Sequence, residues 1–97
     1  MNFEDLQLHD ATLEVITYKW ASSEVIFTGQ LVSHKPTNFI LKFSAASFLA
    51  ASHENEWGSS SSINSLSQSG CEYCFQMQSG DDIRVKAAGF TFETINT

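Results

Sequence analysis

Positive charge and proline are scarce in this chain, and long apolar runs are missing. Its 97 residues include five Lys or Arg, eleven Asp or Glu and one Pro, and the formal net charge is −6. Nucleic acids and anionic membrane surfaces attract proteins through Lys and Arg side chains. No segment approaches the ~20 apolar residues that a membrane-spanning helix needs. The composition therefore predicts that the protein binds neither nucleic acid nor membranes.

The start of the chain lacks the features of a secretory signal. Residues 1–6 read Met-Asn-Phe-Glu-Asp-Leu, with neither a basic segment nor an apolar one. We therefore expect a soluble, cytoplasmic protein. The length favours a single domain over residues 1–97, because two separate cores would each bury too little surface to be stable.

Charged residues are also few, and serine takes their place. They make up 16% of the chain, whereas about 25% is usual for globular domains. Serine is a mediocre helix former because its hydroxyl competes for backbone partners, whereas aromatic and β-branched residues favour strands. The composition therefore favours strands and turns over helices.

Apolar and polar residues alternate along most of the chain, as they do in strands with one buried face. The segments with this pattern are 12–20, 24–31, 38–44, 63–67, 71–78, 83–87 and 90–95. Segment 45–53 is rich in Ala and could form a short helix or a strand that carries Phe48, and its short length favours an irregular segment or a strand. The sequence Ser79-Gly80-Asp81-Asp82 is the clearest hairpin turn, because Gly tolerates the positive φ that tight turns need. The spacing predicts an all-β fold, a single-domain antiparallel sandwich or strongly curled sheet of six to seven short strands.

The first of these strands has two possible arrangements. Leu13 and Val15 are expected to share one face, because they lie two residues apart. Ile16 and Tyr18 then lie on the other face or follow a β-bulge.

The cysteines occur as Cys71-Glu72-Tyr73-Cys74. A structural zinc site normally needs four ligands, and residues three apart on a strand point to opposite faces. The histidines His9, His34 and His53 show no ligand spacing. We therefore expect two half-buried thiols, no metal and no cofactor.

His9 and Asp10 are candidate binding residues ahead of the first strand. A histidine oriented by a carboxylate can act as a base or a ligand. The alternative is a turn in which Asp10 accepts hydrogen bonds from backbone amides and His9 packs at a sheet edge. Neighbouring side chains on an extended chain diverge, which favours the turn.

Residues Trp57, Gly58, Ser59 and Ser60 form a second candidate, a binding loop. Trp57 would serve as an aromatic anchor, and the backbone amides of the small residues would meet an anion. The alternative is that Trp57 caps the sheet and the serines are solvated. The loop lacks the lysine and spacing of a phosphate loop, and the chain has no G-x-S-x-G nucleophile motif. No catalytic residue is predicted, and we expect a protein that is not an enzyme.

Three pieces of the chain occur together in the order of one family. They are Leu-His-Asp-Ala-Thr-Leu at 8–13 followed by Trp20, Glu-Trp-Gly-Ser-Ser at 56–60 followed by Asn64, and Met-Gln-Ser-Gly-Asp at 77–81. They resemble a family of small uncharacterised bacterial proteins with the motifs HDA-x-L…W, WGPS…N and MQSGD. The second piece departs from the pattern because it has no proline. The resemblance implies a compact β domain from bacteria with no established activity, and it adds Asn64 to the candidate binding residues.

Size, acidity and the missing catalytic motifs lead to three hypotheses of function. The first is a small, acidic, non-enzymatic protein-binding module for a basic partner. Small proteins of similar size and pattern resemble immunity proteins, so an inhibitor of a basic toxin is one form of this hypothesis. The second is a structural or assembly domain that self-associates through an open sheet edge or an exposed aromatic face. The third is a small metal- or ligand-binding protein that uses His9 and Asp10, with His53 as a further candidate.

Overall fold

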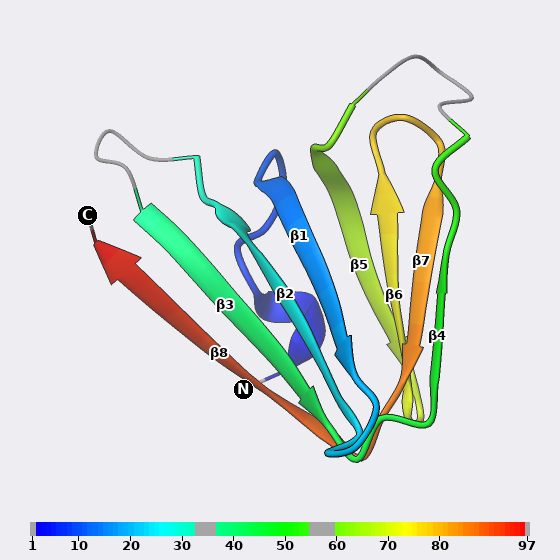
Figure 1. Cartoon of the computed structure of the whole chain (residues 1–97). Helices are drawn as coiled ribbons and strands as arrows, with labels where there is room; N and C mark the ends of the chain where they lie inside the picture. Colours follow the sequence, from blue (N-terminus) through cyan, green and yellow to red (C-terminus); the bar gives the residue numbers. More distant parts are fainter. Residues whose placement is uncertain (1, 33–36, 55–59, 97) are drawn as a thin grey trace.

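The computed structural model describes residues 2–32, 37–54 and 60–96 (Figure 1). These residues form one short 3-10 helix, η1, and eight strands. The elements are η1 (Phe3–Asp5), β1 (Thr12–Lys19), β2 (Glu24–Gln30), β3 (Thr37–Ser44), β4 (Phe48–Ala51), β5 (Ile63–Ser69), β6 (Glu72–Met77), β7 (Asp82–Lys86) and β8 (Gly89–Asn96).

The strands form two antiparallel sheets of four strands each, in the orders β1-β2-β3-β8 and β4-β7-β6-β5 (Figure 1). The predicted all-β antiparallel fold is confirmed. The described residues contain eight strands rather than six or seven, because the ambiguous segment 45–53 contributes β4. No helix in the described residues is long and apolar enough to cross a membrane.

The two sheets are joined at one corner by a bent two-stranded ribbon. β3 pairs with β8 along its whole length, and β4, which follows β3 closely in the chain, pairs with β7. Ala45 at the bend has φ 50°, and the Ala46 amide donates a hydrogen bond to the Ser23 carbonyl at 2.7 Å. Strands commonly pass from one sheet to another through such bends. Figure 1 shows the two sheets converging at this corner and spreading apart away from it.

A second link joins the sheets where β1 and β5 begin (Figure 1). Thr12 and Ser62 form an isolated antiparallel bridge. Beside it, the Leu13 amide donates to the Ser61 carbonyl at 2.8 Å, and the Ile63 amide donates to the Ala11 carbonyl at 2.9 Å. The ribbon and this link join the two sheets at two places. On the other two sides of the sandwich, the edge strands of different sheets are not paired with each other. One of these sides lies between β8 and β5, and the other lies between β1 and β4.

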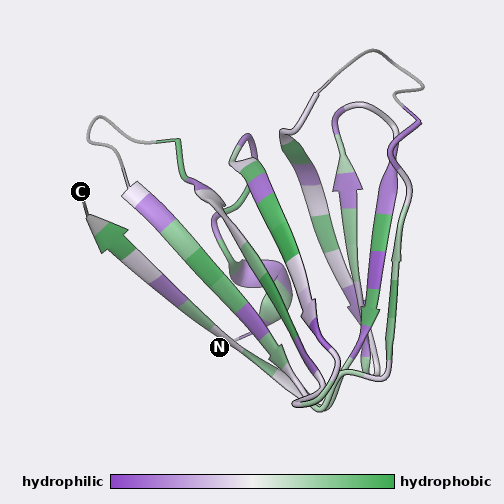
Figure 2. Cartoon of the chain, viewed as in Figure 1, coloured by the Kyte–Doolittle hydropathy of each residue, from purple (hydrophilic) through white to green (hydrophobic). Residues whose placement is uncertain are grey.

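The core lies between the sheets and is rich in aromatic side chains. On β2 and β3, Val25, Phe27, Phe39, Leu41 and Phe43 are fully buried, as the alternation predicted. The second sheet supplies Tyr73, Phe75, Met77, Ile83 and Val85. Figure 2 shows the matching change from apolar to polar residues along these strands.

The side between β8 and β5 is closed by the start of the chain. Phe3 on η1 is fully buried, and the centre of its ring lies 5.0 Å from that of Tyr73, 5.4 Å from Phe75 and 5.6 Å from Phe90. The Gln68 amide on β5 donates to a carboxylate oxygen of Glu4 at 3.3 Å. Phe3 therefore fills the interior of this side with an aromatic ring, and an open hollow of about 460 Å³ beside Tyr73, Phe90 and Phe92 remains at the surface.

A β-bulge changes which residues of β1 face inward. The register of the β1–β2 pairing shifts between Leu13 and Val15. The expectation that these two share a face is therefore wrong: Leu13 and Ile16 are half-buried, whereas Val15 is 52% exposed. The alternative with a bulge is confirmed. Gly29 pairs with Leu13, and a Cβ atom there would lie 1.9 Å from the Thr12 carbonyl oxygen, so only glycine permits this approach.

Candidate functional site

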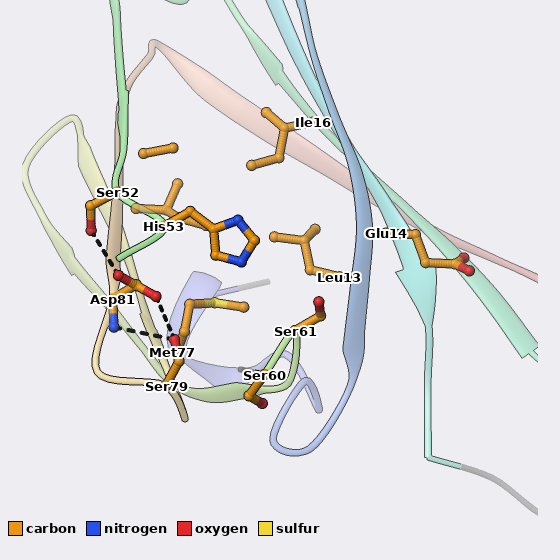
Figure 3. Close-up of a pocket in the computed structure, with 12 residues that line it drawn as sticks. Leu13, Glu14, Ile16, Ser52, His53, Ser60, Ser61, Met77, Ser79 and Asp81 are labelled. Atoms are coloured by element: carbon orange, nitrogen blue, oxygen red, sulfur yellow. Dashed lines mark hydrogen bonds between the residues drawn. The ribbon is translucent and has the colours of Figure 1, made fainter. Parts of the chain in front are cut away.

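The side of the sandwich between β1 and β4 holds a cavity of about 290 Å³ (Figure 3). Residues from β1, from the end of β4, from the chain before β5 and from the β6–β7 hairpin line it. They are Leu13, Glu14, Ile16, Ala51, Ser52, His53, Ser60, Ser61, Met77, Ser79, Asp81 and Ile83. Because Ala51, His53 and Ser61 are exposed, the cavity reaches the protein surface.

Apolar side chains from both sheets form the walls of the cavity. Leu13 and Ile16 face it from β1, which follows from the bulge. Met77 and Ile83, both buried, face it from the β6–β7 hairpin, and Ala51 adds a small apolar surface. Such a lining, with a few polar groups among apolar ones, is typical of small-molecule sites.

Asp81 organises the polar end of the cavity, and it is only 4% exposed. Its Oδ2 accepts a hydrogen bond from the Ser79 hydroxyl at 2.7 Å (Figure 3). Its Oδ1 accepts from the Glu54 amide at 2.6 Å and from the Ser52 hydroxyl at 3.4 Å. A buried carboxylate is stable only with such partners. Asp81 thus ties residues 52–54 to the β6–β7 hairpin and fixes the position of His53.

The imidazole of His53 points into the cavity, toward Leu13 (Figure 3). Within the described part of the chain, no hydrogen bond occupies either ring nitrogen, and the hydroxyl of Ser61 is likewise unpaired. A neutral imidazole has one donor and one acceptor, and a hydroxyl can play both roles. These two side chains therefore offer hydrogen bonds to a molecule in the cavity.

The predicted candidates His9 and Asp10 lie together in a turn ahead of β1. The favoured turn is present, with Asp10 at φ 66°, and because the chain is not extended there the two side chains do not diverge. His9 Nε2 lies 3.6 Å from Asp10 Oδ1, and the two side chains are 68% and 53% exposed.

Both residues of this turn contact neighbouring strands. His9 Nδ1 donates to the carbonyl oxygen of the predicted residue Asn64 at 2.7 Å, and the Gln78 side-chain amide donates to Asp10 Oδ1. These contacts hold the turn against β5 and the end of β6. A role in binding for His9, Asp10 and Asn64 stays a prediction.

Of the predicted binding loop, Trp57, Gly58 and Ser59 lie outside the described residues. Ser60 lines the cavity, and its hydroxyl accepts a hydrogen bond from the Ser62 amide at 3.1 Å. Ser60 is the one predicted binding residue within the described ranges that reaches the cavity. Of the predicted binding residues that the structure describes, Ser60 lies at the cavity, whereas His9, Asp10 and Asn64 lie at the turn against β5.

Sequence reasoning missed the part that Asp81 plays, and it named His53 only as a further candidate beside His9 and Asp10, away from any cavity. Asp81 was correctly placed in a hairpin turn, where Gly80 has φ 93°, but its contacts with residues 52–54 come from another segment. His53 follows the stretch whose structure was left open. One feature of the sequence could have indicated the site. The carboxylate of Asp81 lies between Met77 and Ile83, whose apolar side chains face inward.

The cysteines are free thiols. Cys74 is half-buried as expected, but Cys71 is exposed, because it precedes the first residue of β6 and points to no core position. Among the described residues, no group of three or more His, Cys, Asp or Glu side chains is placed to hold a metal ion.

No protein-family model, curated protein or solved structure matches this chain.

Proposed function

We propose that this chain is a small binding protein that takes a small molecule into the cavity between β1 and β4. The observation that carries the proposal is the combination of an apolar wall with the unpaired hydrogen-bonding groups of His53 and Ser61. Apolar side chains supply affinity, and a few polar groups orient the bound molecule. This proposal keeps the ligand-binding hypothesis and moves its site from His9 and Asp10 to His53.

The size of the cavity supports a binding role. Protein interiors are close-packed, and gaps larger than a water molecule are few. An opening of about 290 Å³ between two sheets is much larger than such a gap. The walls expose apolar surface that ligand binding would remove from water, which contributes roughly 25 cal/mol per Å².

Two alanines on β4 provide a matched test. Ala51 pairs with Ile83 and lines the cavity, whereas Ala50 pairs with Arg84 and lies on the outer face of the sheet. Small aromatic and aliphatic fragments are titrated into 15N-labelled protein and followed by amide chemical shifts. We expect shifts at Leu13 and His53, lost in Ala51→Phe and retained in Ala50→Phe. Equal binding to the two variants, or no shift with any fragment, would overturn the proposal.

Protein binding is a second candidate, favoured by the free edge of β8. This strand ends its sheet in the described structure, contains no proline, and carries Glu93 as its one charged residue. Unprotected edge strands pair readily with strands of other chains. With a net charge of −6, the edge would favour a basic partner over an acidic one. The immunity-like hypothesis and self-association both belong to this candidate.

Thr91→Lys tests the β8 edge, with Thr17→Lys as a control. Thr17 lies in the same row of sheet positions at the opposite edge, because Thr17 pairs with Ile26, Ile26 with Lys42, and Lys42 with Thr91. Sedimentation over a wide concentration range detects self-association, and capture from host lysate at low and high salt detects a basic partner. An assembly lost only in Thr91→Lys supports this candidate, and a monomer with no salt-sensitive partner removes it.

A further inference from the structure

We infer that the cavity selects an uncharged molecule of about twelve non-hydrogen atoms, apolar over most of its surface, with one hydrogen-bonding group against His53. The inference rests on the proposed function and names the class of ligand that this site would take. Three features of the cavity carry it, namely its volume, the state of its charged groups and the position of its unpaired polar groups.

The volume sets the size of the molecule. A protein cavity of about 150 Å³ lined by apolar side chains accommodates benzene. The cavity here measures about 290 Å³, close to twice that value. A bicyclic aromatic compound or a branched alkyl chain of similar bulk therefore fits within the cavity, whereas much of a nucleotide or a disaccharide would extend beyond it into solvent.

The charged groups at the cavity argue against a cationic ligand. Asp81 is the buried carboxylate of the lining, and both of its oxygens accept hydrogen bonds from Ser79, Ser52 and the Glu54 amide. The net charge of −6 attracts a cation, but a cation in the cavity would have to share the Asp81 oxygens with these donors or remain unpaired against an apolar wall. Burying an unpaired charge in this way costs more free energy than the contact returns.

An anionic ligand is disfavoured for a different reason. Among the described residues, no Lys or Arg lines the cavity. Glu14 is part of the lining, although its carboxylate points away from His53 in Figure 3. The whole chain carries a net charge of −6. An anion would therefore enter a site with no fixed positive partner in a repulsive field.

His53 and Ser61 determine the remaining polar requirement. Neither side chain has a hydrogen-bond partner within the described residues, and both lie where the cavity reaches the surface. A hydroxyl or amide group on the ligand can donate to one of them and accept from the other. The apolar part of the same molecule would then lie against Leu13, Ile16 and Met77.

Four naphthalene probes test the ligand class at constant ring size: naphthalene, 2-naphthol, 2-naphthoate and 2-naphthylmethylammonium. Each is titrated by fluorescence and amide chemical shifts into the wild-type protein, Ala51→Phe and Ala50→Phe. We expect 2-naphthol to bind at least about ten-fold more tightly than either charged probe, which corresponds to about 1.4 kcal/mol. Ala51→Phe should abolish this binding, and Ala50→Phe should retain it.

His53→Leu tests the polar contact separately, because leucine keeps the apolar bulk without the ring nitrogens. We expect it to weaken 2-naphthol about three- to ten-fold, the effect of one hydrogen bond, and to leave naphthalene unchanged. His9→Leu, which changes a histidine outside the cavity lining, should alter neither. Equal weakening of naphthalene and 2-naphthol would overturn the role of His53.

The outcomes separate this inference from the proposed function. If a charged probe binds as tightly as 2-naphthol and Ala51→Phe abolishes that binding, the ligand class is wrong while the cavity remains a binding site. If no probe binds, or if all bind Ala51→Phe as well as wild type, both the ligand class and the proposed function are wrong.

Discussion

The two sides on which strands of different sheets are not paired differ in what fills them. Between β8 and β5, the fully buried ring of Phe3 packs against Tyr73, Phe75 and Phe90. Between β1 and β4, no aromatic side chain lines the cavity among the described residues, and the imidazole of His53 points into the space instead. One side holds a fully buried aromatic ring, with a more open hollow of about 460 Å³ at the surface beside Tyr73, Phe90 and Phe92. The other side is a cavity of about 290 Å³ with unpaired polar groups among the described residues.

This difference shows that the opening between β1 and β4 is not an inevitable result of the fold. The N-terminal segment closes one side with a single aromatic residue, so a comparable residue at Ala51 or Ser61 could reduce the other opening. The chain instead holds residues 52–54 in place through the hydrogen bonds of Asp81. These hydrogen bonds hold one wall of the cavity in place and leave its interior open.

The largest expected loss of stability comes from removing Phe3, the aromatic residue that fills the interior between β8 and β5. Phe3→Ala should lower the free energy of unfolding by about 3–5 kcal/mol, because it leaves a cavity among four other rings, those of Phe43, Tyr73, Phe75 and Phe90. Trp20→Ala is the control, since Trp20 is 84% exposed and should change stability by less than ~0.5 kcal/mol. Urea unfolding measures both. A loss below about 1 kcal/mol for Phe3→Ala would mean that this side is not part of the cooperative core.

The second largest loss of stability is expected when the hydrogen bonds of Asp81 are removed, because they hold residues 52–54 at the cavity between β1 and β4. Asp81→Ala removes the acceptor of the hydrogen bonds from Ser52, Glu54 and Ser79 and should cost about 1–3 kcal/mol, because the donors lose their partner. Hydrogen exchange at the Glu54 amide should also accelerate. Asp82→Ala, which removes an exposed carboxylate next in the chain, is the control. Slow exchange at Glu54 in Asp81→Ala would contradict the network.

A smaller change in stability is expected when Phe replaces either of two alanines, and the two variants compare the space around each position. Ala46 is 5% exposed at the ribbon bend, and Ala46→Phe should destabilise the protein by about 1–3 kcal/mol through overpacking. Ala51→Phe extends into the cavity and should leave stability unchanged or raise it by up to about 1 kcal/mol. Thermal unfolding under identical conditions provides the comparison. Equal losses in the two variants would show that the second side is also close-packed.

The smallest effect is expected at the turn against β5. His9→Ala removes the hydrogen bond to the Asn64 carbonyl and should cost less than about 1 kcal/mol, because the side chain is largely exposed. The binding of 2-naphthol should be unchanged. If His9→Ala abolished that binding, the site would lie at the turn rather than in the cavity.

The packed sheets could be predicted from the sequence because the alternation has a local cause. Phe39, Leu41 and Phe43 face inward at every second position, and neighbouring residues alone establish that pattern. The exposed side chain of Val15 shows where prediction from the alternation of apolar residues fails. The bulge that redirects Leu13 and Ile16 depends on pairing with β2, and pattern alone left it as one of two alternatives.

The cavity could not be predicted because its residues come from segments far apart in the chain. Ser60 was identified as part of a loop, but nothing local indicates that it lies near Ile16. Asp81 contacts Glu54 across 27 residues, and that contact positions His53. At His9–Asp10 the turn was expected correctly, but the contact between the two side chains was not, since a positive φ brings together side chains that an extended chain would separate.

The most direct test of the account is the location of bound 2-naphthol by intermolecular nuclear Overhauser effects. We predict contacts from the ring protons to the methyl groups of Leu13, Ile16 and Met77, and from the edge that carries the hydroxyl to the imidazole of His53. Contacts to Phe90 or Phe92 on the opposite side, or no contact to the cavity walls, would contradict the claim that the side between β1 and β4 is the binding site.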